Sequence, residues 1–177
     1  MLRSIRSHPV HVVFATCIGS GATACQPQEE TETAELAHVV ASSAAAAGQY
    51  LVILGGCNDC HTDGYMQNAG NVPEEQWLLG SQVGFRGPWG TTYPANLRLT
   101  VQDLSEDDWV TMLRSRTALP PMPWMNINRM GEADARAMYQ YIQSLGPGGG
   151  HVPDAVPPDE EPGTPYIWLV PVIPGEE

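Results

Sequence analysis

The sequence predicts an all-α domain of about three main helices, with loop-rich connections and an extended, Pro-rich C-terminal tail. Two observations predict this class. Apolar residues in the clearest regular segment, 131–145, recur at three- and four-residue steps, which is the period of a helix. The segments between them are rich in Gly and Pro, which is typical of loops. The chain has 177 residues, of which 42% are hydrophobic, so we expect one modest core.

Residues 1–24 have the pattern of an export signal. Arg3 and Arg6 precede a short apolar stretch, and small residues follow it up to Cys25. The apolar stretch is too short to span a membrane permanently. Ala-Thr-Ala before Cys25 also resembles a bacterial lipoprotein cleavage box, in which the cysteine carries a lipid anchor. We therefore expect a periplasmic or exported protein, either free or membrane-anchored through Cys25; a cytosolic N-terminus with an incidental cysteine is the alternative.

Three further regions follow the predicted signal. Residues 25–40 begin with an acidic stretch without apolar residues, which predicts a flexible tether. Residues 41–146 hold the predicted helices and form the expected domain. Residues 147–177 are a Gly- and Pro-rich tail with an apolar patch at 166–170. The patch predicts either a strap over the domain or a surface that docks to a partner.

The helices are expected in this order. An alanine run that leads into QYLVIL predicts the first helix over 41–55, where two glycines end it. Residues 62–103 are rich in Gly, Pro, Asn and Thr and are expected to be mostly loop. A capping-box pattern predicts the second helix over 105–114. The third covers 131–145, where acidic residues occupy the first turn and apolar residues share one face, and Gly146 stops it.

The charge of the chain is strongly acidic. Twenty Asp and Glu residues against eight Arg and Lys residues give a formal net charge of -12. Such a surface disfavours binding to nucleic acid and anionic membranes, and it favours docking to a basic patch on a protein partner. Solubility alone is the other explanation for the acidity.

The segment Cys57-Asn58-Asp59-Cys60-His61 is the strongest functional pattern. Two cysteines separated by two residues each add through sulfur to one vinyl group of a haem, and the histidine that follows binds the iron. The sequence therefore predicts one covalently attached haem c. A redox-active thiol pair or a zinc site is the alternative. A zinc site would require a second pair of ligands in the domain. A thioredoxin-type motif would lie between a strand and a helix, whereas this motif follows a predicted helix.

Several segments resemble the class I monohaem cytochromes c, over about residues 46–146. They are GGCNDCHT, GPWGTTYPANL, LPPMPW and ARAMYQYIQSL, and the tail sequence VPPDEEPGTPYI is similar as well. The resemblance implies the cytochrome c fold, in which the first and last helices cross and the haem lies between the CxxCH segment and a methionine loop. The resembling segments are those of small periplasmic cytochromes that occur beside dehydrogenases and oxidases. Arg98-Leu99 departs from the Thr-Pro that such relatives carry.

The second iron ligand is predicted to be Met122. Prolines on both sides of it fix the backbone, so the thioether is held with little movement between oxidation states. The resemblance points to the same residue. Met125 is the leading alternative, and His38 or His151 would give a bis-His haem. We expect Met112, Met130 and Met138 to pack in the core.

The haem propionates need hydrogen-bond donors. We expect Asn96 and Arg86, in the loop at the haem edge, to be these donors. The same loop holds three other donors, Trp89, Tyr93 and Arg98. Ordinary packing in the loop is the alternative role for each. We expect Trp124, next to the chosen ligand, to shield the iron from water.

The expected function is electron transfer rather than catalysis. A His61/Met122 iron would carry one electron between redox proteins, such as a dehydrogenase, a quinol-oxidising complex, an oxidase or another cytochrome. A fixed electron-accepting subunit of a dehydrogenase is the main alternative. A haem enzyme or sensor with an open iron is the third possibility. Met122 argues against it, because it would occupy the second ligand position of the iron.

Overall fold

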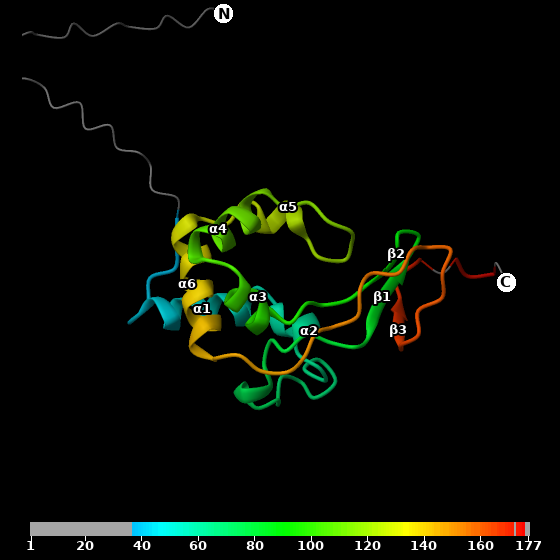
Figure 1. The fold of residues 1–177 in the computed structure, drawn as a ribbon, viewed down its shortest axis with the longest axis horizontal. Helices are drawn as coiled ribbons and strands as arrows, with labels where there is room; N and C mark the ends of the chain where they lie inside the picture. The colour runs from blue at the N-terminus through cyan, green and yellow to red at the C-terminus, as the bar shows by residue number, and fades with distance from the viewer. Residues whose placement is uncertain (1–36, 172, 176–177) are drawn as a thin grey trace, which may run out of the picture. The chain divides into compact units, whose positions relative to one another are not determined.

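The computed structural model describes residues 37–171 and 173–175 of the chain. The predicted export signal, Cys25 and the first part of the predicted tether lie outside these residues. In the described part, no helix is long and apolar enough to cross a membrane. In chain order the elements are α1 (Ala44–Leu54), α2 (Cys57–His61), η1 (Glu74–Gln76), β1 (Gly84–Gly87), β2 (Gly90–Thr92), α3 (Leu97–Asp103), α4 (Glu106–Ser115), α5 (Trp124–Ile127), α6 (Glu132–Ser144) and β3 (Tyr166–Trp168) (Figure 1).

The prediction of an all-α fold is wrong, because part of the chain forms a three-stranded mixed sheet in the order β2-β1-β3. Strand β1 pairs antiparallel with β2 and parallel with β3. Strands β1 and β2 lie in the segment 62–103, which was predicted to be mostly loop from its Gly and Pro content. Some of those residues instead make the tight turn of a hairpin. Strand β3 comes from the distant tail, and local sequence patterns do not indicate such a pairing.

The three predicted helices are present as α1, α4 and α6. Helix α4 begins after Ser105, whose hydroxyl accepts a hydrogen bond from the backbone N–H of Asp108 at 3.1 Å, as the capping pattern predicts. Helix α3 was not predicted. It begins after Asn96, whose side-chain oxygen accepts from the backbone N–H of Leu99 at 3.1 Å.

Helices α1 and α6 cross in direct contact, as expected for the first and last helices. A Cβ atom placed on Gly48 would lie 2.0 Å from the carbonyl oxygen of Ala137 and 2.7 Å from the Cβ of Tyr141. Only glycine lets two backbones approach so closely. The crossing therefore depends on the missing side chain at this one position.

The hydrophobic core is built mainly by α1, α4 and α6. Trp109 of α4 is fully buried, and its indole N–H donates to the carbonyl of Ala135 at 2.9 Å. Met138 belongs to the core, and Met112 and Met130 pack against it, which confirms the packing role predicted for these methionines. The buried cluster is Val52, Leu78, Val101, Trp109, Val110, Leu113, Ala135, Met138, Tyr141 and Ile142.

The C-terminal tail lies against both edges of the β1–β2 hairpin. Val156 exchanges two backbone hydrogen bonds with Thr91 of β2, at 2.8 and 2.9 Å. Further along, β3 pairs with the opposite edge of the hairpin, along β1 (Figure 1). The tail is therefore a strap over the hairpin, although the side chains of Tyr166–Leu169 stay 36–54% exposed.

Arg86 of β1 joins the hairpin to this strap. Its guanidinium donates to the hydroxyl of Thr91 at 2.9 Å and to the carbonyl of Pro158 at 3.3 Å. The same group lies 5.6 Å from the ring centre of Tyr166 and 5.9 Å from that of Trp168. A cation held over two aromatic rings accounts for aromatic residues on an exposed strand.

Replacing Gly48 with Ala should disrupt the crossing of α1 and α6, because the new methyl group would overlap the Ala137 carbonyl. We expect the free energy of unfolding to fall by about 3 kcal/mol or more, measured by denaturant titration. Gly163→Ala is the control, because a Cβ at Gly163 meets no atom within 4 Å. Equal stability of the two variants would contradict the role given to Gly48.

Candidate functional site

The short helix α2 carries the two cysteines and the histidine of the sequence motif. Gly56, in the left-handed region at φ +65°, separates α2 from α1 and lets the chain turn into a new helix. Residues three and four positions apart share one face of a helix. Cys57, Cys60 and His61 therefore face the same way, and both thiols are free and partly buried.

One ring nitrogen of His61 forms a hydrogen bond with the protein backbone. Its Nδ1 lies 2.7 Å from the carbonyl oxygen of Ala95, and since a carbonyl only accepts, Nδ1 carries the proton. The lone pair is then on Nε2. Burial lowers the pKa of the imidazole, so the ring is neutral near pH 7. A neutral imidazole with an oriented Nε2 is the form that binds a metal ion.

A buried hydrogen-bond network fixes α2 against the following chain. The Thr62 hydroxyl donates to the side-chain oxygen of Asn58 at 2.7 Å and accepts from the backbone N–H of Leu78 at 2.8 Å. The N–H of Gly80 donates to the His61 carbonyl at 2.9 Å. These bonds hold the helical turn that presents the motif, and Asn58 Nδ2 is buried without a partner among the described residues.

The two thiols have raised pKa values. Burial, with a smaller contribution from Asp59 and Cys60, raises the pKa of Cys57 to about 11, and burial followed by Asp59 raises that of Cys60. Redox-active and catalytic cysteines have lowered pKa values instead. In the described part of the chain, no group of three or more His, Cys, Asp and Glu side chains could hold a metal ion. The raised pKa values of both thiols are thus opposite in direction to those expected of a thiol oxidoreductase.

Met122 lies in the loop between α4 and α5 and is partly buried, whereas Met125 on α5 is 70% exposed. Two hydrogen bonds tie this loop to its surroundings. The Thr92 hydroxyl donates to the Pro120 carbonyl at 2.7 Å, and the amide of Asn128 donates to the carbonyl of Arg116 at 3.2 Å. The first bond ties the middle of the loop to β2 and the second joins the caps of α4 and α5, so together they restrict the positions open to Met122.

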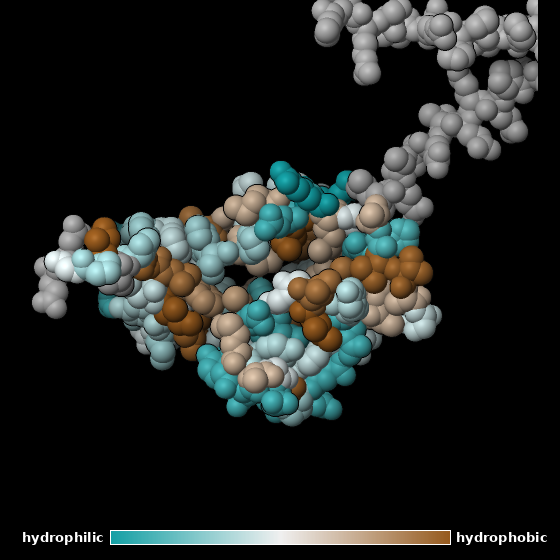
Figure 2. All heavy atoms as spheres, turned by 180° about the vertical axis from the view of Figure 1, so that it is seen from behind, coloured by the Kyte–Doolittle hydropathy of each residue, from teal (hydrophilic) through white to brown (hydrophobic). Residues whose placement is uncertain are grey.

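One short segment, residues 92–95, forms hydrogen bonds with both His61 and the methionine loop. Thr92 binds the loop through Pro120, and Ala95, three residues later, binds His61. In the ribbon, this segment runs from the sheet past α2 into α3 (Figure 1). The face seen in Figure 2 is hollowed near its centre, and both apolar and polar side chains border the hollow. The structure therefore places the predicted iron ligands on segments that a common strand end connects.

The predicted propionate donors are engaged with the protein itself. The amide nitrogen of Asn96 donates to the carbonyls of Gly148 at 2.8 Å and Gly150 at 3.2 Å. Arg86 has the partners described above, and Glu161 lies 3.6 Å from its Nη2. These contacts support the packing alternative for both residues.

Of the three remaining loop donors, two already have partners in the described part of the chain and one does not. Arg98 donates to the carbonyls of Glu75, Leu145 and Gly146, and the Tyr93 hydroxyl pairs with that of Thr164 at 2.7 Å. The indole N–H of Trp89 is buried without a partner among the described residues. Of this loop, Trp89 therefore keeps a donor that is available to a bound group.

The structure also gives the positions of Trp124, His38 and His151. Trp124 packs against the core and lies under Arg116, whose guanidinium is 5.2 Å from the ring centre. His38 and His151 are exposed, on segments outside the helices. Ala95 and Thr92 were not identified from the sequence. Ala95 acts through its backbone carbonyl, for which no side-chain signal exists, and the residue type of Thr92 is ordinary for a strand.

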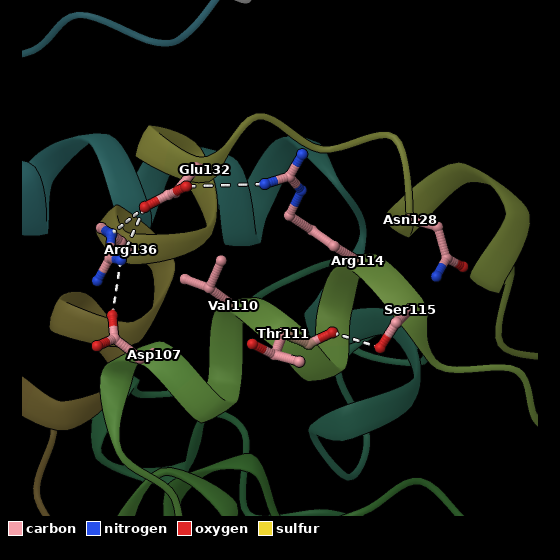
Figure 3. Close-up of a pocket in the computed structure, with 8 residues that line it drawn as sticks. All are labelled: Asp107, Val110, Thr111, Arg114, Ser115, Asn128, Glu132 and Arg136. Carbon is pink, nitrogen blue, oxygen red and sulfur yellow. Dashed lines mark hydrogen bonds and ion pairs between the residues drawn. The ribbon is translucent and has the colours of Figure 1, made fainter.

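An open groove between α4 and α6 shows no comparable chemistry (Figure 3). Arg136 donates to Glu132 and Asp107, each at 2.7 Å, and Arg114 lies 3.7 Å from Glu132. These hydrogen bonds to carboxylates raise the pKa of Arg136. Its arginines are thus paired, and no residue of the sequence-predicted site lines the groove.

No family model, curated protein or solved structure matches this chain. A function is therefore inferred from the residues of the site. The features that bear on it are the single face of α2, the orientation of His61, and the tied loop that carries Met122.

Replacing Thr62 with Val keeps the side-chain shape and removes the hydroxyl. The Leu78 N–H and the Asn58 side-chain oxygen would then be buried without partners, so we expect a loss of about 3 kcal/mol in the free energy of unfolding. Thr62→Ser should recover most of it. Denaturant titration of the three proteins measures the difference, and a Val variant as stable as the Ser variant would argue against the network.

Proposed function

We propose that this protein is a one-electron carrier that binds a single haem c through Cys57 and Cys60, with His61 and Met122 as the two axial ligands of the iron. One observation carries the proposal. A single helical turn presents two free thiols and a neutral imidazole on one face, and the Ala95 carbonyl leaves the Nε2 of that imidazole for a metal. This donor set suits covalent haem better than zinc or thiol exchange.

The residues present fit a haem. Each thiol would add across one vinyl group, so that sulfur bonds to one carbon and the thiol hydrogen goes to the other, without an oxidant or reductant. The orphaned indole N–H of Trp89 is a donor that a propionate would accept, whereas Asn96 and Arg86 already donate to the protein.

The bound haem supplies an iron that gains and loses one electron. His61 would hold its ligand nitrogen in one orientation, because Ala95 fixes the other nitrogen. Met122 would close the second axial position, since its loop is tied at Pro120 and Arg116. A closed iron with rigid ligands favours electron transfer over substrate binding, which is why an enzyme or sensor function is less well supported.

We propose redox proteins with a basic docking face as the partners, because the chain carries a net charge of -12. In this proposal the protein is exported, and Cys25 either marks the cleavage site or holds a lipid anchor. A fixed subunit of a dehydrogenase is the second candidate. The four exposed apolar residues at Tyr166–Leu169 favour it, because such a patch suits a lasting interface.

The haem should stay attached when the protein is denatured and extracted with acid, because two thioether bonds hold it. The test requires expression with the export signal in a host that attaches haem c. Replacing both Cys57 and Cys60 with Ala should give protein without haem, while Asp59→Asn, which keeps both thiols, should retain it. Release of haem from the unmodified protein would exclude a c-type site.

Replacing Met122 with Ala should open the iron. The oxidised variant should lose the weak long-wavelength sulfur-to-iron absorption band, and the reduced variant should gain carbon monoxide binding and show a lower potential. Met125→Ala is the matched control and should change none of these. If the two variants behaved the other way round, Met125 would be the ligand. Avid carbon monoxide binding by the unmodified protein would contradict the electron-carrier function.

A further inference from the structure

The loop that carries Met122 is weakly held by packing. Residues 117–121 are all exposed, so little apolar burial fixes them. Within the described part of the chain, the hydrogen bond from the Thr92 hydroxyl to the Pro120 carbonyl, at 2.7 Å, is the one that ties these residues to another element. Pro120 lies two residues before Met122. The Thr92–Pro120 hydrogen bond is therefore the contact through which β2 restricts the loop next to Met122.

Thr92, by contrast, lies at a well-fixed place. It is the last residue of β2 and pairs with Phe85 of β1. Its neighbour Thr91 is fully buried, bonds Val156 of the tail through the backbone, and accepts from Arg86. Both sides of the hairpin are thus paired, so the Thr92 hydroxyl projects from a rigid base.

The same backbone continues to Ala95, whose carbonyl orients His61. Thr92 and Ala95 are three residues apart, so the support of the histidine and the support of the methionine loop belong to one short, fixed segment. A displacement of the loop from Thr92 would move Met122 relative to His61 without moving His61 itself.

We propose that Thr92 is a positioning residue, whose hydroxyl holds the Met122 loop in the arrangement that keeps the second axial position closed. This inference rests on the proposed haem ligation. The bond to Pro120 opposes opening of the loop, and the strap over the hairpin keeps the Thr92 hydroxyl in place.

Titration of the oxidised protein with imidazole tests this directly, because imidazole binds only when Met122 leaves the iron. Loss of the long-wavelength sulfur-to-iron band reports the exchange. Thr92→Val, which removes the hydroxyl and keeps the shape, should raise the apparent affinity for imidazole about fivefold, the effect of one ordinary hydrogen bond. Thr92→Ser should restore an affinity close to that of the unmodified protein.

Thr100→Val is the matched control. The Thr100 hydroxyl also donates to a backbone carbonyl, that of Asn96 at 2.9 Å, but within α3 and away from the methionine loop. Its affinity for imidazole should equal that of the unmodified protein. An unchanged affinity in Thr92→Val, or an equal rise in Thr100→Val, would overturn the inference.

Met122→Ala separates this inference from the proposed function. If that variant loses the band while Thr92→Val behaves like the unmodified protein, the ligand assignment holds and the role of Thr92 fails. If Met122→Ala keeps the band, the ligand assignment itself fails, and the inference fails with it.

Discussion

The hydrogen bond between His61 Nδ1 and the Ala95 carbonyl is the contact on which the site depends. It decides which imidazole nitrogen carries the proton, and so which nitrogen keeps a lone pair. The segment around Ala95 also organises the neighbouring structure. Asn96 caps α3 and binds the backbone of the tail at Gly148 and Gly150, while Thr92 binds the methionine loop. A strand end of a few residues thus connects the motif helix, the loop, α3 and the tail.

The acidic charge of the chain is only partly opposed at its surface, because two of its arginines are buried in internal contacts. Arg98 binds three backbone carbonyls and Arg86 joins the hairpin to the strap, whereas Arg136 pairs with carboxylates in a partly exposed position. Arginine suits these positions because its planar group makes several hydrogen bonds in fixed directions. The surface field is therefore dominated by Asp and Glu, which agrees with the proposed docking to a basic partner.

The sheet shows where inference from local patterns fails. Gly and Pro in the segment 62–103 predicted a loop, and they instead form the turn of the β1–β2 hairpin and the close contact of Gly90 with the tail, where a Cβ would lie 2.2 Å from the Val156 carbonyl. Tyr166–Trp168 was interpreted as an apolar patch of a strap or a docking surface. It is a strand because β1 accepts it as a partner, and Arg86 occupies the space beside its aromatic rings.

The sequence by itself determined the three main helices, the Ser105 cap of α4 and the spacing of Cys57, Cys60 and His61. These depend on residues at most a few positions apart, so helix period and capping chemistry are sufficient. Only the tertiary structure decided which ring nitrogen of His61 is committed, which element ties down the Met122 loop, and that Asn96 and Arg86 bind the tail. Those outcomes depend on the backbone carbonyls of Ala95 and Pro120 and of tail residues such as Gly148 and Pro158. Every residue carries a backbone carbonyl, so its use as a partner is set by the folded chain rather than by residue type.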